Sequence, residues 1–234
     1  MQIALSRLRI LVTAAAAGLA VSCASGARYA KTTGDGSQPN APAAPSPATA
    51  LDPAPPENPP AGAFPIDPVH SSAVFRIKHL GTDFYGRFDQ MDGYVLFDPR
   101  NPGGGEIFVT IPTASVDTDK EARDEHLRSP DYFAADEYDE MRFVSSEITP
   151  LSGDRYRVDG DLTIRGVTRP LSTEFTYGGE SFDPFMETMK KSGSAEFTIS
   201  RSAFGVDGTP SLLSDEVDVL LGIEAKAPEG ASEG

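Results

Sequence analysis

Three residues in the middle of the sequence, His79, Asp117 and His126, have side chains that could move protons near neutral pH. A histidine changes charge close to physiological pH and a carboxylate can hold or deprotonate it, so this set would suit acid–base chemistry. Arg123 lies between two of them in the sequence, and an Arg paired with an Asp is also a frequent structural tie. Asp117, Arg123 and His126 therefore have two interpretations: contacts to the polar head group of a ligand, or an ion-pair network that anchors a helix.

Composition and spacing argue against several other kinds of site. The single cysteine excludes an intramolecular disulfide and a cysteine-based metal cluster. The three histidines are far apart and no cofactor-binding motif occurs, so we predict no metal and no cofactor. The net charge is −15 without any basic cluster, which argues against nucleic acid, because binding there depends on Lys and Arg contacts to phosphates.

The N-terminus has the features of an export signal. Two arginines precede an apolar run at residues 10–20, which is too short to span roughly 30 Å of hydrocarbon. Residues 20–23 (Ala-Val-Ser-Cys) resemble a bacterial lipoprotein box, in which the cysteine becomes the acylated first residue of the mature protein. We predict a signal peptide at residues 1–22 and lipidation of Cys23; the alternative is ordinary cleavage that removes Cys23.

The residues that follow, 23–64, are predicted to be a linker. Eleven of the 20 prolines fall between Pro39 and Pro68, and the segment has few charges and few large apolar side chains. Such a composition cannot bury enough apolar surface to offset its conformational entropy, and its proline content makes it semi-rigid. With Ala24 rather than Asp after the cysteine, we expect export to the periplasm and a lipid anchor in the outer membrane. Residues 228–234 form a short polar tail.

From residue 65 to residue 227 apolar and polar residues alternate with the period of two that is typical of β-strands. The candidate strands are residues 73–79, 84–90, 93–98, 106–111, 141–148, 155–164, 173–177, 195–199 and 217–223. Turn signals at 98–105, 152–154, 165–168 and 178–179 separate them. Eight or nine short strands with hairpin-length connections predict an all-β fold, an antiparallel barrel or sandwich.

One segment departs from this alternation. Thr118 and Glu121 have the spacing of a capping box, in which two side chains satisfy the free backbone amides at a helix start. We predict a short helix over residues 119–128 that packs Leu127 onto one end of the barrel.

The pattern alone leaves the barrel interior open to two interpretations. A barrel of about eight strands is either filled by its own side chains or wide enough for one small ligand. Several inward positions are small, among them Ala73, Gly86, Gly160 and Ala195, and they are interspersed with Phe.

Ten segments of the domain form a collinear set of motifs. They are FRIKHLG (75–81), YGRF (85–88), GYVLFDP (93–99), ASVDTD (114–119), RDEHL (123–127), DYF (131–133), MRF (141–143), GDLTIRGVTRP (160–170), ISRSAFG (199–205) and SDEVD (214–218). In this order they resemble the polyisoprenoid-binding YceI-like family. Two departures are Ala203, where the family often has an acidic residue, and Phe185, where a Trp is frequent.

The resemblance implies an extended, eight-stranded antiparallel β-barrel, lipocalin-like, with one short helix capping an end. It also implies that an apolar cavity holds an amphipathic isoprenoid lipid, polyprenyl phosphate or quinone-like, without catalysis. The residues expected to line this cavity are Phe75, Ile77, His79, Phe88, Val95, Phe97, Val109, Ile111, Phe143, Val158, Leu162, Ile164, Phe175, Phe197, Ile199, Val219 and Leu221. Asp117, Arg123 and His126 would contact the head group. The oligomeric state stays open, with a dimer possible.

Two alternatives stand beside lipid binding. The first is an envelope enzyme that uses His79, Asp117 or His126 as acid–base groups on a lipid-like substrate. The second is a non-catalytic stress or interaction module with a filled barrel.

Overall fold

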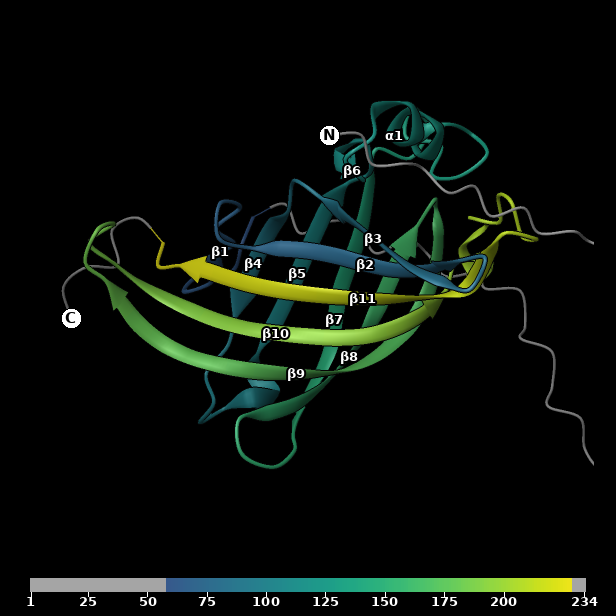
Figure 1. Ribbon diagram of the computed structural model, residues 1–234. Helices are drawn as coiled ribbons and strands as arrows, with labels where there is room; N and C mark the ends of the chain where they lie inside the picture. Colours follow the sequence, from purple (N-terminus) through teal and green to yellow (C-terminus); the bar gives the residue numbers. More distant parts are fainter. Residues whose placement is uncertain (1–57, 229–234) are drawn as a thin grey trace, which may run out of the picture. The chain divides into compact units, whose positions relative to one another are not determined.

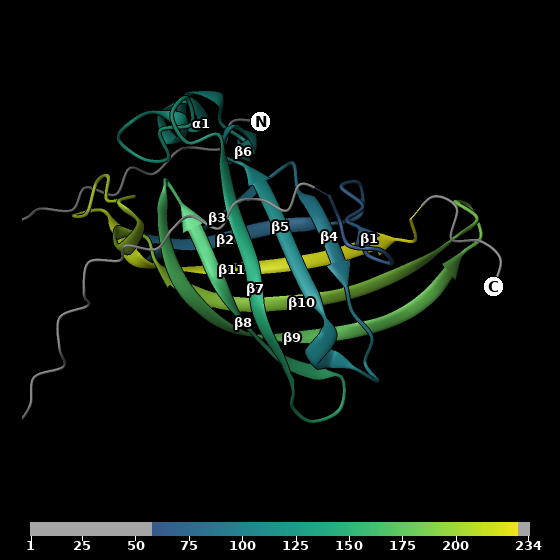
Figure 2. The same ribbon diagram turned by 180° about the vertical axis from the view of Figure 1, so that it is seen from behind.

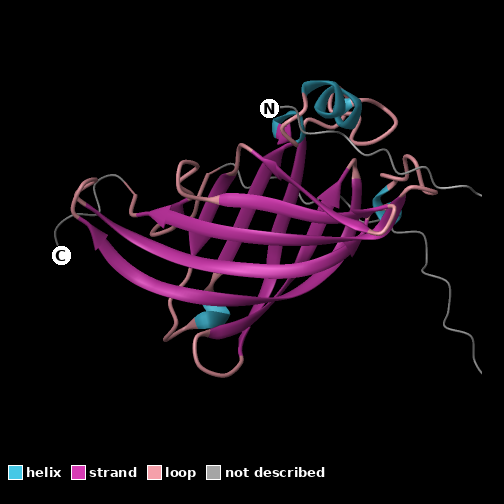
Figure 3. Ribbon diagram, in the orientation of Figure 1, coloured by secondary structure: helices cyan, strands magenta, loops and turns pink. Residues whose placement is uncertain are grey.

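The computed structural model describes residues 58–228, and nearly all of their regular structure is β (Figures 1 and 3). The strands are β1 (Phe64–Pro65), β2 (Ser72–His79), β3 (Thr82–Phe88), β4 (Asp92–Leu96), β5 (Glu106–Pro112), β6 (Val116–Asp117), β7 (Glu140–Pro150), β8 (Arg155–Ile164), β9 (Val167–Asp183), β10 (Thr188–Ser200) and β11 (Leu213–Lys226). The helix α1 (Glu121–Arg128) and the single 3₁₀ turns η1 (Pro102–Gly104), η2 (Thr113–Ser115) and η3 (Ser202–Phe204) complete the set. Cys23, the predicted signal peptide, most of the predicted linker and residues 229–234 lie outside the described residues.

All eleven strands belong to one antiparallel sheet with the order β1-β4-β5-β7-β8-β9-β10-β11-β2-β3-β6. The sheet curls strongly, so that β2 and β11 lie across the space in front of β5 and β7 (Figures 1 and 2). Two links draw its borders together: Ile66 bridges Ala225 of β11, and β6 pairs with β3. The all-β, antiparallel barrel-like prediction is therefore confirmed. The resemblance implied eight strands, whereas the alternation gave nine candidates, which correspond to β2–β5 and β7–β11. The two further strands, β1 and β6, have two residues each and are too short to show a pattern.

The described domain begins slightly before the predicted boundary at residue 65. Ala63 is only 3% exposed and lies in a small apolar cluster with Tyr94 and Phe108, and Phe64 already pairs with Val95. The last residues assigned to the linker are therefore part of the fold.

The hairpin of β9 and β10 is longer than predicted. Gly178 and Gly179 are not a turn; they lie inside β9, where the register with β10 shifts between Ser192 and Gly193. Gly179 has a φ of +103°, a backbone conformation that residues with a side chain rarely adopt. The glycine pair thus forms a bulge that bends a continuous strand.

The helix α1 begins two residues later than predicted, and the capping box is absent. The side chain of Thr118 donates to the buried carboxylate of Asp124, whose Oδ1 also accepts the Thr118 amide at 2.9 Å. Asp119 has a φ of 61°, which a right-handed helix does not allow. Lys120 is consequently the residue that precedes the helix, without a side-chain cap. The predicted docking of Leu127 is confirmed, since it packs on a cluster with Tyr132 and Ile164.

Three phenylalanine rings on the inner face lie over glycines of a neighbouring strand. A Cβ atom at Gly86 would overlap the ring of Phe75, and one at Gly193 would overlap the ring of Phe175. The same relation joins Gly160 to Phe143. Because the glycines leave room at the wall, these rings lean onto the sheet, and the middle of the barrel is less filled.

Within residues 58–228 no helix combines the length and the apolar composition that a membrane crossing needs.

Candidate functional site

The curled sheet encloses a cavity of about 810 Å³ whose walls are mainly apolar side chains. This volume is typical of small-molecule binding sites in proteins. Of the residues predicted to line the interior, fifteen do so: Phe75, Ile77, His79, Phe88, Val109, Ile111, Phe143, Val158, Leu162, Ile164, Phe175, Phe197, Ile199, Val219 and Leu221. The interior is hollow, so the structure does not match the alternative of a filled barrel.

Val95 and Phe97, which were predicted to line the cavity, do not. Both belong to the largest core cluster, and Phe97 is only 1% exposed. Its ring makes edge contacts with Tyr156, at 4.8 Å between centroids, and with Tyr177, at 5.1 Å. They are buried as expected, but at a level where other side chains fill the barrel. We call this part of the domain the closed end.

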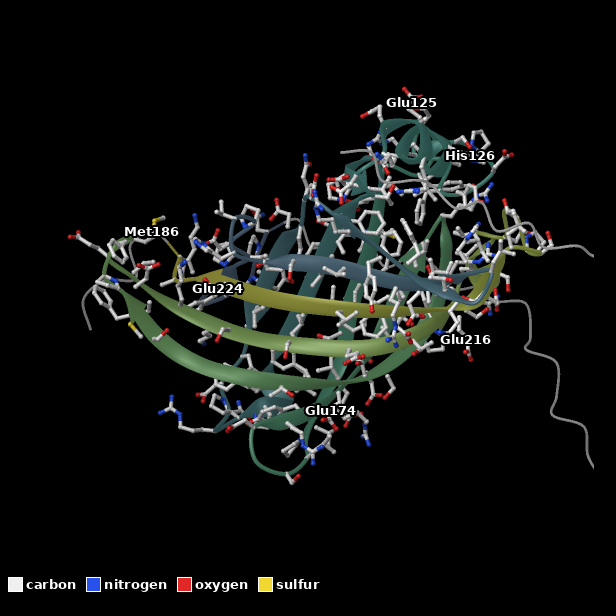
Figure 4. All side chains as sticks on the ribbon, viewed as in Figure 1. Glu125, His126, Glu174, Met186, Glu216 and Glu224 are labelled. Atoms are coloured by element: carbon white, nitrogen blue, oxygen red, sulfur yellow. The ribbon has the colours of Figure 1, made fainter. Side chains whose placement is uncertain are left out.

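The cavity opens near α1, where lining residues become exposed to solvent. Leu80 is 70% exposed and Leu212 is 40% exposed, and both line the cavity. Arg123 and His126 of α1 also line it, and Figure 4 shows His126 on this helix, well apart from Glu224 of β11. We call this part of the domain the open end.

The three predicted head-group residues are not brought together. The carboxylate of Asp117 accepts a hydrogen bond from Arg87 and one at 2.7 Å from the Asp119 amide, and it does not line the cavity. Arg123 donates to Thr118 and lies over the ring of Phe84, 4.5 Å from its centroid. The predicted role of Asp117 at the head group is therefore wrong, because the residue turns outward to an arginine of β3.

His126 lies at the rim of the cavity in a partly exposed position. Its Nε2 atom is 3.4 Å from a carboxylate oxygen of Asp131, and its ring meets that of Tyr132 edge-on at 5.1 Å. Within residues 58–228 no hydrogen bond or ion pair joins His126, His79 and Asp117 to one another. The acid–base set that the sequence suggested is not assembled in this structure.

Two further arginines line the cavity that the sequence analysis did not single out. Arg142 donates from Nε and Nη2 to the carboxylate of Glu140, at 3.1 and 2.7 Å. Arg201 is only 6% exposed and donates to three backbone carbonyls. Arg201 occurs in the ISRSAFG segment, so a listing of charged residues within the family-like motifs would have found it.

Acidic groups are scarce on the cavity wall. Asp83 is the only carboxylic acid among the lining residues, and it lies at the exposed rim. The Lys78 ammonium, 2.6 Å away, donates a hydrogen bond that holds the pKa of the Asp83 carboxyl below its usual value. The polar part of the cavity is therefore mainly cationic.

The closed end also contains a buried cation, Lys190, which is 7% exposed. Its ammonium lies 3.1 Å from carboxylate oxygens of each of Asp67, Asp183 and Glu224. Burial alone would raise the pKa of Asp67, but hydrogen bonds from His70, Lys190 and the Val69 amide outweigh it and lower the pKa to about 2. We call these residues the lysine cluster.

The lysine cluster includes three groups with the chemistry of metal ligands. Single ligand atoms of Asp67, His70 and Glu224 lie within 4.8 Å of one another. The Lys190 ammonium is bonded to both carboxylates, so the cluster already has its own cation. The sequence analysis predicted no metal because the histidines are far apart in the sequence. Sequence spacing does not detect a group such as Asp67, His70 and Glu224, whose members come together only in the fold.

Comparison with known proteins agrees with this architecture. Residues 64–225 match the model of the YceI-like domain. A UPF0312 protein of Photorhabdus laumondii is 40% identical over 159 residues, which are 66% of this chain and 80% of that protein. Protein YceI of Escherichia coli O157:H7 is 38% identical over 157 residues, 66% of this chain and 81% of that protein.

Solved structures show the same fold. BcnA of Burkholderia cenocepacia has a TM-score of 0.61 at 29% identity, over 68% of this chain and 99% of that one. A polyisoprenoid binding domain from Saccharophagus degradans has a TM-score of 0.58 at 18% identity, over 71% of this chain and 99% of that one. With a family match over most of the chain and relatives near 40% identity, this protein belongs to the YceI-like family.

Proposed function

We propose that the cavity binds an amphipathic isoprenoid lipid, with the apolar chain inside the barrel and the polar head group at the open end. The observation that carries this proposal is a hollow of about 810 Å³ with almost uninterrupted apolar walls and a polar rim. The fold is shared with a domain described as polyisoprenoid-binding, which adds support at the level of architecture.

The walls favour a long, branched hydrocarbon. Burying one CH₂ group contributes roughly 0.8 kcal/mol, so a chain of fifteen carbons offers on the order of 10 kcal/mol before the cost of association. The aromatic side chains Phe75, Phe143, Phe175 and Phe197 are spread over four strands, β2, β7, β9 and β10, so the apolar wall surrounds the ligand. The chain would therefore supply most of the affinity.

Lipid binding can be tested by extraction and by a pair of matched substitutions. The purified protein is extracted with organic solvent for mass spectrometry, and binding of added farnesol is measured by calorimetry. Ala195→Phe places a ring on the cavity wall, whereas Glu196→Phe places the same ring on the next, exposed residue of β10. We expect Ala195→Phe to weaken farnesol binding at least about tenfold and Glu196→Phe to leave it unchanged. Absence of both extracted lipid and farnesol binding would contradict the proposal.

We also propose that the protein is exported and held at the outer membrane through an acylated Cys23. The lipoprotein-like residues 20–23 and the proline-rich segment behind them support this proposal. Cells given radiolabelled palmitate should label the natural protein but not Cys23→Ala. Equal labelling of the two, or recovery of a mature protein that begins after Cys23, would contradict it.

A further inference from the structure

The polar part of the cavity contains a buried positive charge that no carboxylate contacts directly. Arg201 is 6% exposed, and its Nε donates to the carbonyl of Ser214 at 2.8 Å. Its Nη1 donates to the carbonyls of Val206, at 2.7 Å, and Gly208, at 2.9 Å. Within residues 58–228 the Nη2 atom has no hydrogen-bond partner.

The carbonyl groups satisfy hydrogen bonds but do not neutralise the guanidinium. No carboxylate of the described chain forms an ion pair with Arg201. The nearby Asp215 is hydrogen-bonded to Ser200 and to the Ser202 amide, and its attraction to Arg201 is the smallest of the effects that lower its pKa. A buried charge whose counter-charge is not in direct contact is only partly compensated in an apolar environment. An anionic group in the cavity, in contact with the guanidinium, would lower the remaining cost.

Arg201 is positioned where a head group would lie. Its three carbonyl partners belong to the segment 206–214, which also contributes Thr209 and Leu212 to the cavity wall at the open end. Arg123 and His126 line the same end from α1. A protein of net charge −15 therefore has a ligand cavity whose polar lining is mainly basic.

We propose that Arg201 is the residue that selects the head group, and that the head group is acidic, a phosphate or a carboxylate on an isoprenoid chain. This inference rests on the proposed lipid binding and narrows it. The free Nη2 donor and the fixed plane of a guanidinium suit an oxyanion, to which an arginine donates strong, charge-assisted hydrogen bonds. Arg123 at the exposed rim contributes attraction at longer range.

The competing explanation gives Arg201 a structural role only, as the clamp of the segment 206–214. A clamp would make the domain less stable when removed, but it would not distinguish between ligands that share one chain. The test must therefore measure head-group preference and not only stability.

Three ligands with the same fifteen-carbon chain separate these explanations: farnesyl phosphate, farnesol and farnesylamine, each titrated into the whole protein. We expect the phosphate to bind at least about tenfold more tightly than the alcohol, and the amine to bind most weakly. Equal affinity of phosphate and alcohol, or tighter binding of the amine, would overturn the assignment while lipid binding itself stands. If none of the three binds, the proposed function fails.

A pair of arginine substitutions assigns the preference to the residue. Arg201→Gln keeps amide donors for the carbonyls and removes the charge, so the preference for phosphate should fall to about twofold or less while farnesol binding is retained. Arg165→Gln is the matched control, because Arg165 donates to the carbonyls of Gly205 and Pro130 but does not line the cavity. It should keep the full preference; a loss as large as that of Arg201→Gln would overturn the assignment.

Two further arms keep the test decisive. If Arg201→Gln does not fold, the order of affinities measured on the natural protein still decides between an acidic and a neutral head group. Inorganic phosphate at the same concentration should not displace farnesyl phosphate. Displacement would mean that the arginine binds phosphate without a lipid chain and would overturn the assignment.

Discussion

The two ends of the barrel each bury one cation to nearly the same depth, yet the cations have opposite surroundings. Lys190 at the closed end is 7% exposed and has three carboxylates at 3.1 Å. Arg201 at the open end is 6% exposed and has only backbone carbonyls. Depth of burial is therefore a poor guide to the role of a charged residue. The presence or absence of a carboxylate in direct contact separates a structural ion cluster from a residue that can receive an anion.

The comparison is tested most strongly by removing the cation at the closed end. Lys190→Met leaves three carboxylates without their partner, and breaking a buried pair in this way costs about 3 to 5 kcal/mol of unfolding free energy. Lys226→Met is the control, because Lys226 lies opposite Lys190 in the strand register and its side chain forms no hydrogen bond or ion pair within residues 58–228. Urea denaturation should show a change of about 0.5 kcal/mol or less for the control. Equal losses of unfolding free energy for the two variants would contradict the assignment of Lys190 to a structural ion cluster.

A second test compares a phenylalanine of the closed end with one of the cavity wall. Phe97→Ala opens a void in a filled core and should cost about 3 to 5 kcal/mol of unfolding free energy. Phe197 borders an existing hollow and is only partly buried, so Phe197→Ala should cost less than half as much.

Ligand binding should respond in the reverse order. Calorimetry should show weaker farnesol binding for Phe197→Ala, since that variant loses wall surface. A stability loss at Phe197 as large as the loss at Phe97 would indicate that the cavity wall is packed like the core.

The acid sensitivity of the domain should arise at the closed end. Asp67 has its pKa lowered from 3.8 to about 2 in the fold, so its contribution is complete above about pH 5 and is lost as the pH falls towards 2. The shift corresponds to about 2 kcal/mol. Urea titrations between pH 5 and pH 2 should show the difference between the natural protein and Asp67→Asn shrinking as the pH falls. A difference that stays constant over this range would argue against the lysine cluster as the cause.

The smallest effect is expected for an ion pair on the outer surface. Arg155 and Glu174 are 3.1 Å apart and each is nearly half exposed, so water competes with the pair. Arg155→Gln should change the unfolding free energy by about 0.5 kcal/mol or less. A loss comparable to that of Lys190→Met would show that the number of ion pairs, and not their burial, determines stability here.

The strands and the inward face could be predicted from local sequence, because side chains on a strand alternate between two faces whatever the rest of the chain does. Alternation shows which side chains point into the barrel, but not where they lie between its closed and open ends. Val95 and Phe97 are buried as the alternation requires, and only the tertiary structure shows that their level is filled. The two-residue strands β1 and β6 are too short to produce a pattern at all.

The buried charges could not be predicted because their partners are remote. Lys190 is 123 residues from Asp67, and nothing in the residues around either of them indicates the pair. The prediction of where α1 begins failed for a related reason. Thr118 fits a capping box locally, but the carboxylate of Asp124 competes for its amide and hydroxyl. In both cases the structure depends on a contact with a residue outside the local sequence pattern.

The phenylalanine rings that lie over Gly86, Gly160 and Gly193 make the width of the cavity depend on these three glycines. A side chain introduced at one of these glycines would push a ring from the wall towards the axis and narrow the passage at that level. At Gly86 the new side chain would meet only the ring of Phe75, whereas at Gly160 and Gly193 it would also meet the backbone carbonyls of Val144 and Thr176 and disturb the strand pairing. Proteins that share this fold can therefore differ in the width and length of the ligand that they bind through a substitution at a single glycine.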